Sequence, residues 1–298
     1  MGLITLAPDS IYGIKNTDNL NEIEIIDNKE NTSQFYNDKN TEELDKHLIV
    51  KLLADNIELK LNHAITVIEF TSKLPEVKNL DSNDLLTLNK TIDTHNGVPS
   101  DSDLGKRAVA LDVLDSHDIF HRIWFMLDTG HTYLTEPYLY QLNLTKNNGF
   151  LSHPHIKGAI DKNGTFLSPS WQSYATGLNT ATITVPIFSE NKPKEFNGFW
   201  VGALDLNTLD QYFKSLNLPD NQRLILIDQN GFEIADSHTF TLIDQFKELF
   251  NHMESFIMSQ KGESGSLVED NNGKKTLVFY HPIHIKDVTW TLLLTEKI

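Results

Sequence analysis

The chain contains the same strand–turn–strand pattern twice, about a hundred residues apart. In the first copy the apolar run Ile123–Leu127 leads through a turn at 128–130 into a second short apolar run. In the second copy Leu224–Ile227 leads through a turn at 228–231 into another such run. Each copy is followed by a Pro-Ile pair and then by an apolar strand that contains a tryptophan. This spacing predicts two tandem α+β modules, each with its own core, rather than one large domain.

The charge balance and the missing residue types exclude several kinds of partner and site. Acidic residues outnumber basic ones 41 to 25, which gives a net charge of −16. Such a surface repels nucleic acid backbones and anionic lipid headgroups, so we expect neither as a partner. The chain has no cysteine, which excludes thiolate nucleophiles, disulfides and the usual structural zinc sites. No apolar run approaches the roughly 18 residues that a membrane span needs.

A long helix is predicted ahead of the two modules. Residues 1–39 are polar and acidic without a clear period, which predicts a flexible tail. Asn40 can cap a helix whose apolar residues, from 49 to 68, step by threes and fours along one face. Pro75 ends it, and we assign 40–96 to this helix and a connector. Roughly 34 helical residues span about 50 Å, enough to lie along both modules.

The remaining elements follow from local patterns of apolar and turn residues. Helices are predicted at 103–115, at 155–160, after a cap at Asn207, and at 241–260. Strands are predicted around 164–171, 179–188, 198–205, 265–270, 274–281 and 288–295. Trp200 and Trp290 lie inside apolar strands, so we expect both in the core. Asp128 and Asp228 are interpreted as turn residues.

This order of elements resembles the double Cache family of extracellular sensor domains. The resemblance covers about residues 41–298, and order and spacing carry it rather than any single motif. The segments most similar to the family are 173–209, 223–236 and 264–294. It implies an α+β fold in which a long N-terminal helix precedes two tandem PAS-like antiparallel-sheet modules.

The resemblance also implies where each module lies and what it does. Residues 97–217 correspond to the membrane-distal module, which binds the ligand, and 218–298 to the membrane-proximal module. Family members have a transmembrane helix before the long helix and another after the last strand. We therefore expect the extracytoplasmic part of a cell-membrane receptor, linked to the membrane only through segments absent from this chain. A homodimer through the long helix is a further expectation.

Family members that bind amino acids carry a signature in the distal module, and this chain departs from it. The signature begins with Arg-Pro-Trp-Tyr, continues with Tyr-x-Asp and closes with an Asp at a strand end. Here His153 replaces the Arg, His155 the Trp and Ile156 the Tyr. Ser173 replaces the middle Asp, and only the final carboxylate, Asp205, stays. A histidine cannot copy the two parallel hydrogen bonds of an Arg fork to a carboxylate.

The aligned signature implies a set of ligand-binding residues, namely His153, His155, Trp171, Ser173, Tyr174 and Asp205. Because the anionic residue remains and the guanidinium is missing, we hypothesise a small cationic or other polar ligand, such as an amine. Asp205 would supply the counter-charge, and Trp171 and Tyr174 aromatic faces. Two alternatives stay open. Asp205 could simply cap the following helix, or the module could be a scaffold without a ligand.

Neither a catalytic nor a metal site is predicted. The chain lacks a nucleophile elbow, a phosphate loop, a zinc-protease motif and a dinucleotide fingerprint, so we expect no enzyme and no cofactor. Ser173, His153 and Asp205 could be imagined as a hydrolytic triad, but without an ordered signature. The histidine pairs 153/155, 117/121 and 281/284 lack a third ligand at a telling spacing. The competing functional class is a stand-alone soluble small-molecule-binding protein.

Overall fold

The computed structural model describes residues 34–80, 82–144, 150–173, 175–189, 195–238, 249–271 and 273–298. Contacts group residues 45–298 into one compact unit, which holds all the strands. Most of the predicted tail, up to residue 33, lies outside the described residues. None of the helices in the described ranges combines the length and the apolar character that crossing a bilayer requires.

The predicted helices and strands follow one another in the same order in the structure, with further short elements between them. The helices are α1 Gln34–Thr71, α2 Pro75–Lys78, α3 Ser82–His95, α4 Leu104–Ser116, α5 Tyr138–Leu142, the 3-10 turn η1 Phe150–Ser152, α6 Pro154–Lys162, α7 Leu206–Ser215 and α8 Glu254–Gln260. The strands are β1 Phe120–Leu127, β2 Thr132–Glu136, β3 Phe166–Leu167, β4 Trp171–Gln172, β5 Asn179–Thr180, β6 Thr182–Phe188, β7 Phe196–Leu204, β8 Gln222–Ile227, β9 Glu233–Asp236, β10 Gly265–Asn271, β11 Lys274–Ile285 and β12 Val288–Lys297.

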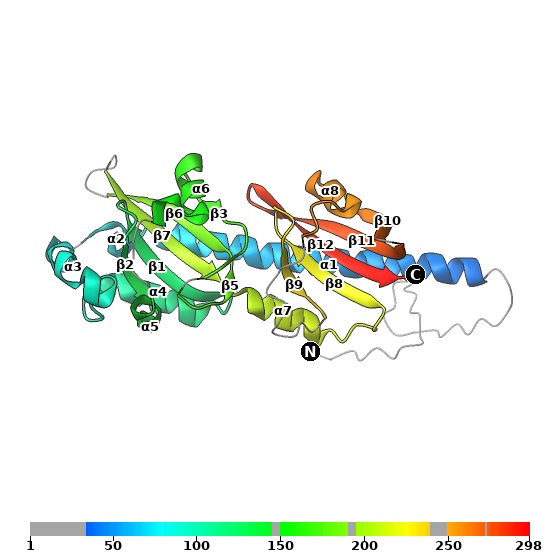
Figure 1. The fold of residues 1–298 in the computed structure, drawn as a ribbon, viewed down its shortest axis with the longest axis horizontal. Helices are drawn as coiled ribbons and strands as arrows, with labels where there is room; N and C mark the ends of the chain where they lie inside the picture. Colours follow the sequence, from blue (N-terminus) through cyan, green and yellow to red (C-terminus); the bar gives the residue numbers. More distant parts are fainter. Residues whose placement is uncertain are drawn as a thin grey trace, which may run out of the picture. The chain divides into compact units, whose positions relative to one another are not determined.

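Two antiparallel sheets of five strands form the centres of the two modules (Figure 1). We name the modules after their expected positions relative to the membrane: the sheet of the distal module has the order β2-β1-β7-β6-β3, and that of the proximal module the order β10-β11-β12-β8-β9. In each sheet the first strand of the hairpin pairs with the module's last strand, β1 with β7 and β8 with β12. Strands β4 and β5 form a separate small hairpin in the distal module. The predicted α+β fold with a long helix and two antiparallel modules is confirmed.

The two faces of the distal sheet bury different sets of side chains, because successive residues of a strand point to opposite faces. On β1, Ile123 and Phe125 belong to the main core, which also takes in the buried residues of α1 and α4. Trp124 and Met126 point the other way. They join a second cluster with residues of α6 and β7, namely Ile156, Ala159, Phe199, Val201 and Ala203. Helix α6 therefore covers the face of the sheet opposite to the main core.

Helix α1 packs against both modules through one apolar face. Its buried residues are Val50, Ala54, Ile57, Leu61, Ala64, Ile65 and Ile68. Thr71 Oγ1 accepts a hydrogen bond of 3.0 Å from the indole N–H of Trp200 in the distal module. The backbone N–H of His284 in the proximal module donates to Glu58 at 2.8 Å. The predicted role of this helix, to lie along both modules, agrees with these contacts.

Three local predictions are wrong. Helix α1 begins at Gln34, so Asn40 lies inside the helix and does not cap it. The cap of α7 is Asp205 rather than Asn207, since Asn207 is already the second helical residue. The helix predicted at 241–260 is shorter in its described part: 239–248 lie outside the described residues, and Leu249 forms a β-bridge to Phe232. Phe250 and Met253, just before α8, pack in the proximal core from a non-helical segment that contains a turn.

The predictions for the tryptophans and for the second turn are confirmed. Trp200 and Trp290 are both fully buried. Asp228 accepts hydrogen bonds from the backbone N–H groups of Asn230 and Phe232, as a turn residue does. Its other carboxylate oxygen accepts the N–H of Ser170 at 2.8 Å, and so joins the two modules.

Candidate ligand-binding site

Helix α6 brings two histidines to the outer face of the distal sheet. Pro154 occupies the first helical position, and His153 precedes it as the N-terminal cap residue. His155, in the first turn, is buried. Gly158 allows the close packing of α6 on β3, because a Cβ atom there would lie 2.2 Å from the ring of Phe166. The absence of a side chain at Gly158 thus lets α6 lie close against Phe166 of β3.

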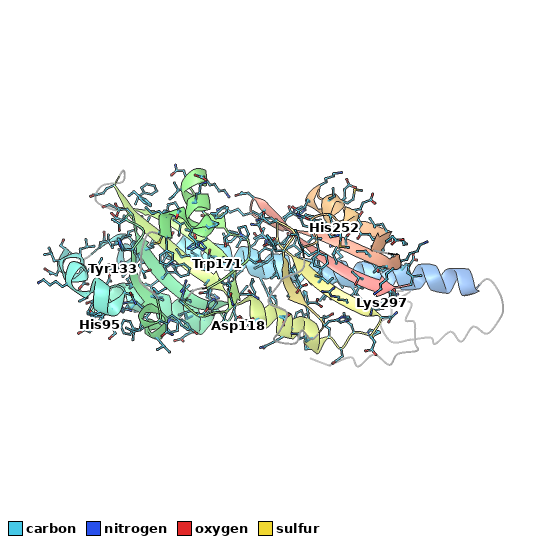
Figure 2. The ribbon with its side chains drawn as sticks, in the orientation of Figure 1. His95, Asp118, Tyr133, Trp171, His252 and Lys297 are labelled. Atoms are coloured by element: carbon cyan, nitrogen blue, oxygen red, sulfur yellow. The ribbon has the colours of Figure 1, made fainter. Side chains whose placement is uncertain are left out.

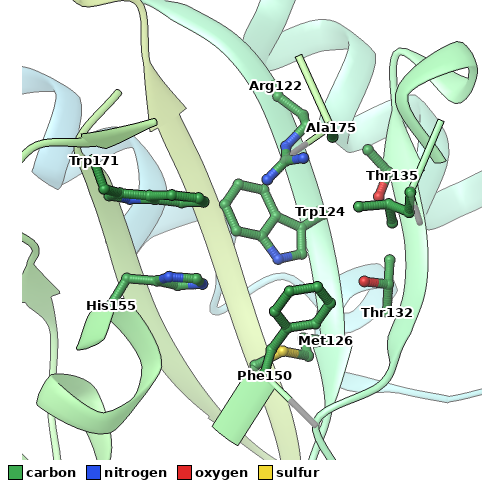
Figure 3. Close-up of a pocket in the computed structure, with 10 residues that line it drawn as sticks. Arg122, Trp124, Met126, Thr132, Thr135, Phe150, His155, Trp171 and Ala175 are labelled. Carbon is green, nitrogen blue, oxygen red and sulfur yellow. The ribbon is translucent and has the colours of Figure 1, made fainter. Parts of the chain in front are cut away.

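Aromatic rings from three elements stack around His155 (Figure 3). Its ring lies parallel to the Trp171 indole, with centroids 4.9 Å apart and an interplanar angle of 4°. Trp124 of β1 meets it edge-on, with centroids 6.0 Å apart. His153 packs against Trp171 at 4.6 Å, and its Nδ1 contacts Nδ1 of His155. Trp171, labelled in Figure 2, is partly exposed, whereas His155 is buried, so the stack runs from the surface into the interior.

These rings border a narrow cavity. The residues that line it are Arg122, Trp124, Met126, Thr132, Thr135, Leu144, Phe150, His155, Trp171 and Ala175. The volume of this cavity is only about 20 Å³. In Figure 3, Trp171 and His155 lie on one side of Trp124, and Thr132 and Thr135 on the other. The cavity thus has aromatic walls and polar groups at one side, as small-molecule sites do.

Burial keeps both histidines neutral. The pKa of His155 lies well below its usual value because the ring is buried, and the neighbouring His153 and Arg122 lower it further. Burial also lowers the pKa of His153. A neutral imidazole has one nitrogen that donates and one that accepts, which suits the contact between the two Nδ1 atoms.

The charged group in the cavity is Arg122. Its side chain is 5% exposed, and its guanidinium carbon lies 4.0 Å from the centroid of the Trp124 ring. Nε has no hydrogen-bond partner, and the guanidinium has no ion pair among the residues that the structure describes. Burial lowers the pKa of Arg122 to about 10, so it stays protonated at neutral pH. A buried charge without a partner is costly and unusual in proteins.

Three of the predicted site residues gather at the cavity. His155 and Trp171 line it, and His153 contacts both rings. Ser173, two residues after Trp171, is buried and has a hydroxyl without a partner in the described part of the chain, but it does not line the cavity. Tyr174 lies outside the described residues.

Asp205 has a different place. Its Oδ1 accepts hydrogen bonds from the backbone N–H of Asn207 at 3.0 Å and from the Asn207 side chain at 3.1 Å. It is not among the described residues that line the cavity. Asp205 therefore has the geometry of a helix cap, which is the alternative role that the sequence left open.

The residues that β1 and β2 contribute to the cavity were not predicted from the sequence. Arg122, Trp124 and Met126 alternate along β1 and line the cavity together with Thr132 and Thr135 of β2. Their period of two was the available signal, since alternate residues share a face of a strand. As for metals, the described ranges hold no group of three His, Asp or Glu side chains placed to bind one.

A model of the Cache domain family matches residues 32–297. This chain belongs to the Cache domain family. The resemblance to double Cache sensor domains is therefore confirmed, and the chain is a sensory domain of this type. A search among curated proteins gave no match.

Several solved structures share the fold of this Cache domain. The ligand-binding domain of the Pseudomonas fluorescens chemoreceptor CtaA, in complex with L-isoleucine, has a TM-score of 0.58 at 18% identity, over 89% of this chain and 96% of that one. The ligand-binding domain of the Pseudomonas aeruginosa chemoreceptor PctC, in complex with GABA, has a TM-score of 0.58 at 14% identity, over 87% of this chain and 100% of that one. The sensory domain of the Campylobacter jejuni chemoreceptor Tlp3, with isoleucine bound, has a TM-score of 0.56 at 13% identity, over 89% of this chain and 95% of that one. At these identities the likeness establishes the fold.

Proposed function

We propose that this Cache domain is the extracytoplasmic sensor domain of a transmembrane receptor and binds a small molecule in its distal module. The cavity beneath the Trp171–His155 stack carries the proposal. It is bordered by aromatic rings and polar groups on the face of the distal sheet that α6 covers. The domains of CtaA and PctC bind small molecules, L-isoleucine and GABA, on the same fold. No catalytic step is part of the proposal.

We do not propose an amine, the ligand class that the sequence favours. That hypothesis needs Asp205 as the counter-charge, and Asp205 caps α7 instead of lining the cavity. The ionised side chain that does line it is Arg122, which repels a cation. His155 and Trp171 are proposed to contact the ligand, with His153 packed against both rings. Ser173, whose buried hydroxyl has no hydrogen-bond partner in the described part of the chain, stays a candidate.

The ligand enters by displacing the Trp171 side chain. The cavity as it stands is too narrow for more than about one water molecule. Trp171 lies on β4, whose one partner among the described strands is the equally short β5. A two-residue hairpin opens at little cost, because few backbone hydrogen bonds hold it.

The same hairpin offers a route to the proximal module. Ser170, the neighbour of Trp171, donates its N–H to Asp228 at 2.8 Å. Gln229, the next residue after Asp228, accepts the indole N–H of Trp290 at 2.8 Å. A shift of Trp171 on ligand binding thus reaches the β8–β9 hairpin and the last strand, β12. Output through the proximal module follows from this route.

The homodimer remains part of the proposal. Helix α1 carries a second apolar stripe of exposed residues, Leu48, Leu52, Leu59 and Phe70. The steps between them fall close to whole turns of an α-helix, so the four share one face. Because the buried face of α1 is already used within the chain, this exposed face suits a second copy.

A thermal-shift screen tests the site. The wild-type domain, Trp171→Ala and the control Phe188→Ala are screened against amines, amino acids, organic acids and nucleobases. Phe188 is an exposed aromatic residue of the same module outside the lining of this cavity. We expect at least one compound to raise the melting temperature of the wild type and the control, and not of Trp171→Ala. Binding that is equally strong in all three proteins contradicts the site.

A further inference from the structure

The two modules share one strand register, with a constant offset of 101 residues. In the distal hairpin Trp124 lies opposite Thr135, and Met126 opposite Thr132, with a bulge after Phe125. In the proximal hairpin Ile225 lies opposite Asp236, and Ile227 opposite Glu233, with a bulge after Leu226. Each proximal residue follows its distal counterpart by 101 positions, as Ile225 follows Trp124.

The turns confirm this register. The N–H of Gly130 donates to the carbonyl of Leu127 at 2.9 Å, and the N–H of Gly231 to that of Asp228 at 3.0 Å. The two glycines have positive φ angles of 85° and 87°. Leu127 and Gly130 again precede their counterparts by 101 positions. By the same offset, Arg122 on β1 corresponds to Arg223 on β8.

In the proximal module the arginine is neutralised by the neighbouring strand. Nε of Arg223 donates to Asp236 at 2.6 Å, and Nη2 lies 3.2 Å from a carboxylate oxygen of Glu233. Both acids belong to β9. Asp236 is fully buried, so this pair replaces water around the guanidinium.

In the distal module the two corresponding positions are threonines. Thr132 takes the place of Glu233, and Thr135 that of Asp236, and both line the cavity with Arg122. The remaining carboxylate of β2, Glu136, forms an ion pair with Arg107. Arg122 therefore has the place of a neutralised arginine without the two carboxylates that neutralise its counterpart.

We propose that a carboxylate of the ligand occupies this place, bound by the guanidinium of Arg122 and flanked by the hydroxyls of Thr132 and Thr135. This inference rests on the proposed function of the same cavity and names its ligand class. The body of the ligand lies against Trp124 and Trp171. None of the described residues that line the cavity is acidic, so nothing there balances an ammonium group. A simple monocarboxylate fits this arrangement better than an amino acid.

A charge graft tests the anion site without any ligand. Thr132→Glu/Thr135→Asp copies the proximal module, and Thr132→Gln/Thr135→Asn is the uncharged control of equal size. We expect the acidic variant to melt at least about 3 °C above the amide variant. The difference should vanish when Arg122→Met is added to both. Equal melting temperatures, or a difference that survives Arg122→Met, overturn the inference. If a double variant does not fold, the single variants Thr135→Asp and Thr135→Asn are compared in the same way.

A second experiment separates this inference from the proposed function. Straight-chain and aromatic monocarboxylates, such as butyrate and benzoate, are compared by calorimetry with their own amides, with the matching amines and with the matching α-amino acids. We expect at least one carboxylate to bind at least tenfold more tightly than its amide and amino acid, and to lose this advantage in Arg122→Met. Binders that depend on Trp171 but are amides, amines or amino acids only would leave the proposed function standing and overturn the carboxylate site. If no compound of any class binds in a Trp171-dependent way, the proposed function is contradicted. The charge graft still decides whether the anion site exists.

Discussion

The guanidinium carbon of Arg122 lies 4.0 Å from the centroid of the Trp124 ring. A cation over an aromatic face gains about 0.5–2 kcal/mol, and it does so without using the N–H donors of the guanidinium. That gain is smaller than the cost of burying a charge. Arg122 is therefore stabilised only in part by the protein, and its donors remain for a ligand. Arg223, at the corresponding position of the other module, has its donors satisfied by Asp236 and Glu233.

The first prediction contrasts these two arginines. Without ligand, Arg122→Met should leave the free energy of unfolding unchanged or raise it by about 1 kcal/mol, because it removes a buried charge that lacks a partner. Arg223→Met should lower it by about 2–4 kcal/mol, because it leaves two carboxylates without their cation. Urea denaturation followed by circular dichroism measures both. Equal losses for the two variants would show that Arg122 is neutralised within the protein.

The second prediction concerns pH. The pKa of His121 is lowered from 6.5 to about 4 by burial, and further by the nearby charge of Arg122. The unfolded chain therefore takes up a proton below about pH 6.5 that the folded chain refuses until about pH 4, so stability falls across this window as the pH drops. His121→Gln should flatten this fall relative to the wild type. His131→Gln, on the distal β1–β2 turn, is the control. Identical slopes in all three proteins would contradict the prediction.

A third prediction separates the cap from the site. Asp205→Ala should destabilise the domain by about 1 kcal/mol, because the N–H of Asn207 loses its acceptor. Asp205→Asn should cost little, since Asn caps helices as well as Asp does. Neither change should alter the affinity for any ligand of the cavity. Loss of binding in both variants, measured by calorimetry, would return Asp205 to the ligand site.

A fourth prediction concerns the second apolar face of α1. If two copies pair through it, Leu52→Glu and Leu59→Glu should shift the domain toward the monomer in sedimentation velocity at micromolar concentration. Leu139→Glu makes the same change at an exposed residue of α5, outside α1, and should leave the dimer intact. A wild-type domain that sediments as a monomer up to about 100 μM would remove the homodimer from the proposal.

The fold was predictable because its signals are local and repeat. Alternating apolar residues mark β1 and β8, the turn glycines end both strands, and the 3.6-residue period marks α1. The boundaries at Gln34 and Asp205 were missed by a few residues. A side chain that can cap a helix does not by itself decide where the backbone hydrogen bonds begin.

The site was less predictable because its charged residue lies within an apolar strand. Arg122 precedes Ile123 and Trp124, and on the sequence alone it has the appearance of a strand-edge residue. On the sequence alone the two hairpins are easily aligned with the wrong offset. Asp128 and Asp228 both follow an apolar run, and aligning them gives an offset one residue shorter than that of the strand pairings. Only the pairing of Thr135 and Asp236 with their neighbouring strands gives the true register, in which Asp228 corresponds to Leu127.

A crystal structure of the domain with the carboxylate that binds most tightly tests the anion site itself. We predict electron density in the distal cavity, with the carboxylate about 3 Å from the guanidinium nitrogens of Arg122 and the body of the ligand beside Trp124 and a displaced Trp171. A ligand in the proximal module, or one bound in the distal cavity with its carboxylate directed away from Arg122, would contradict it.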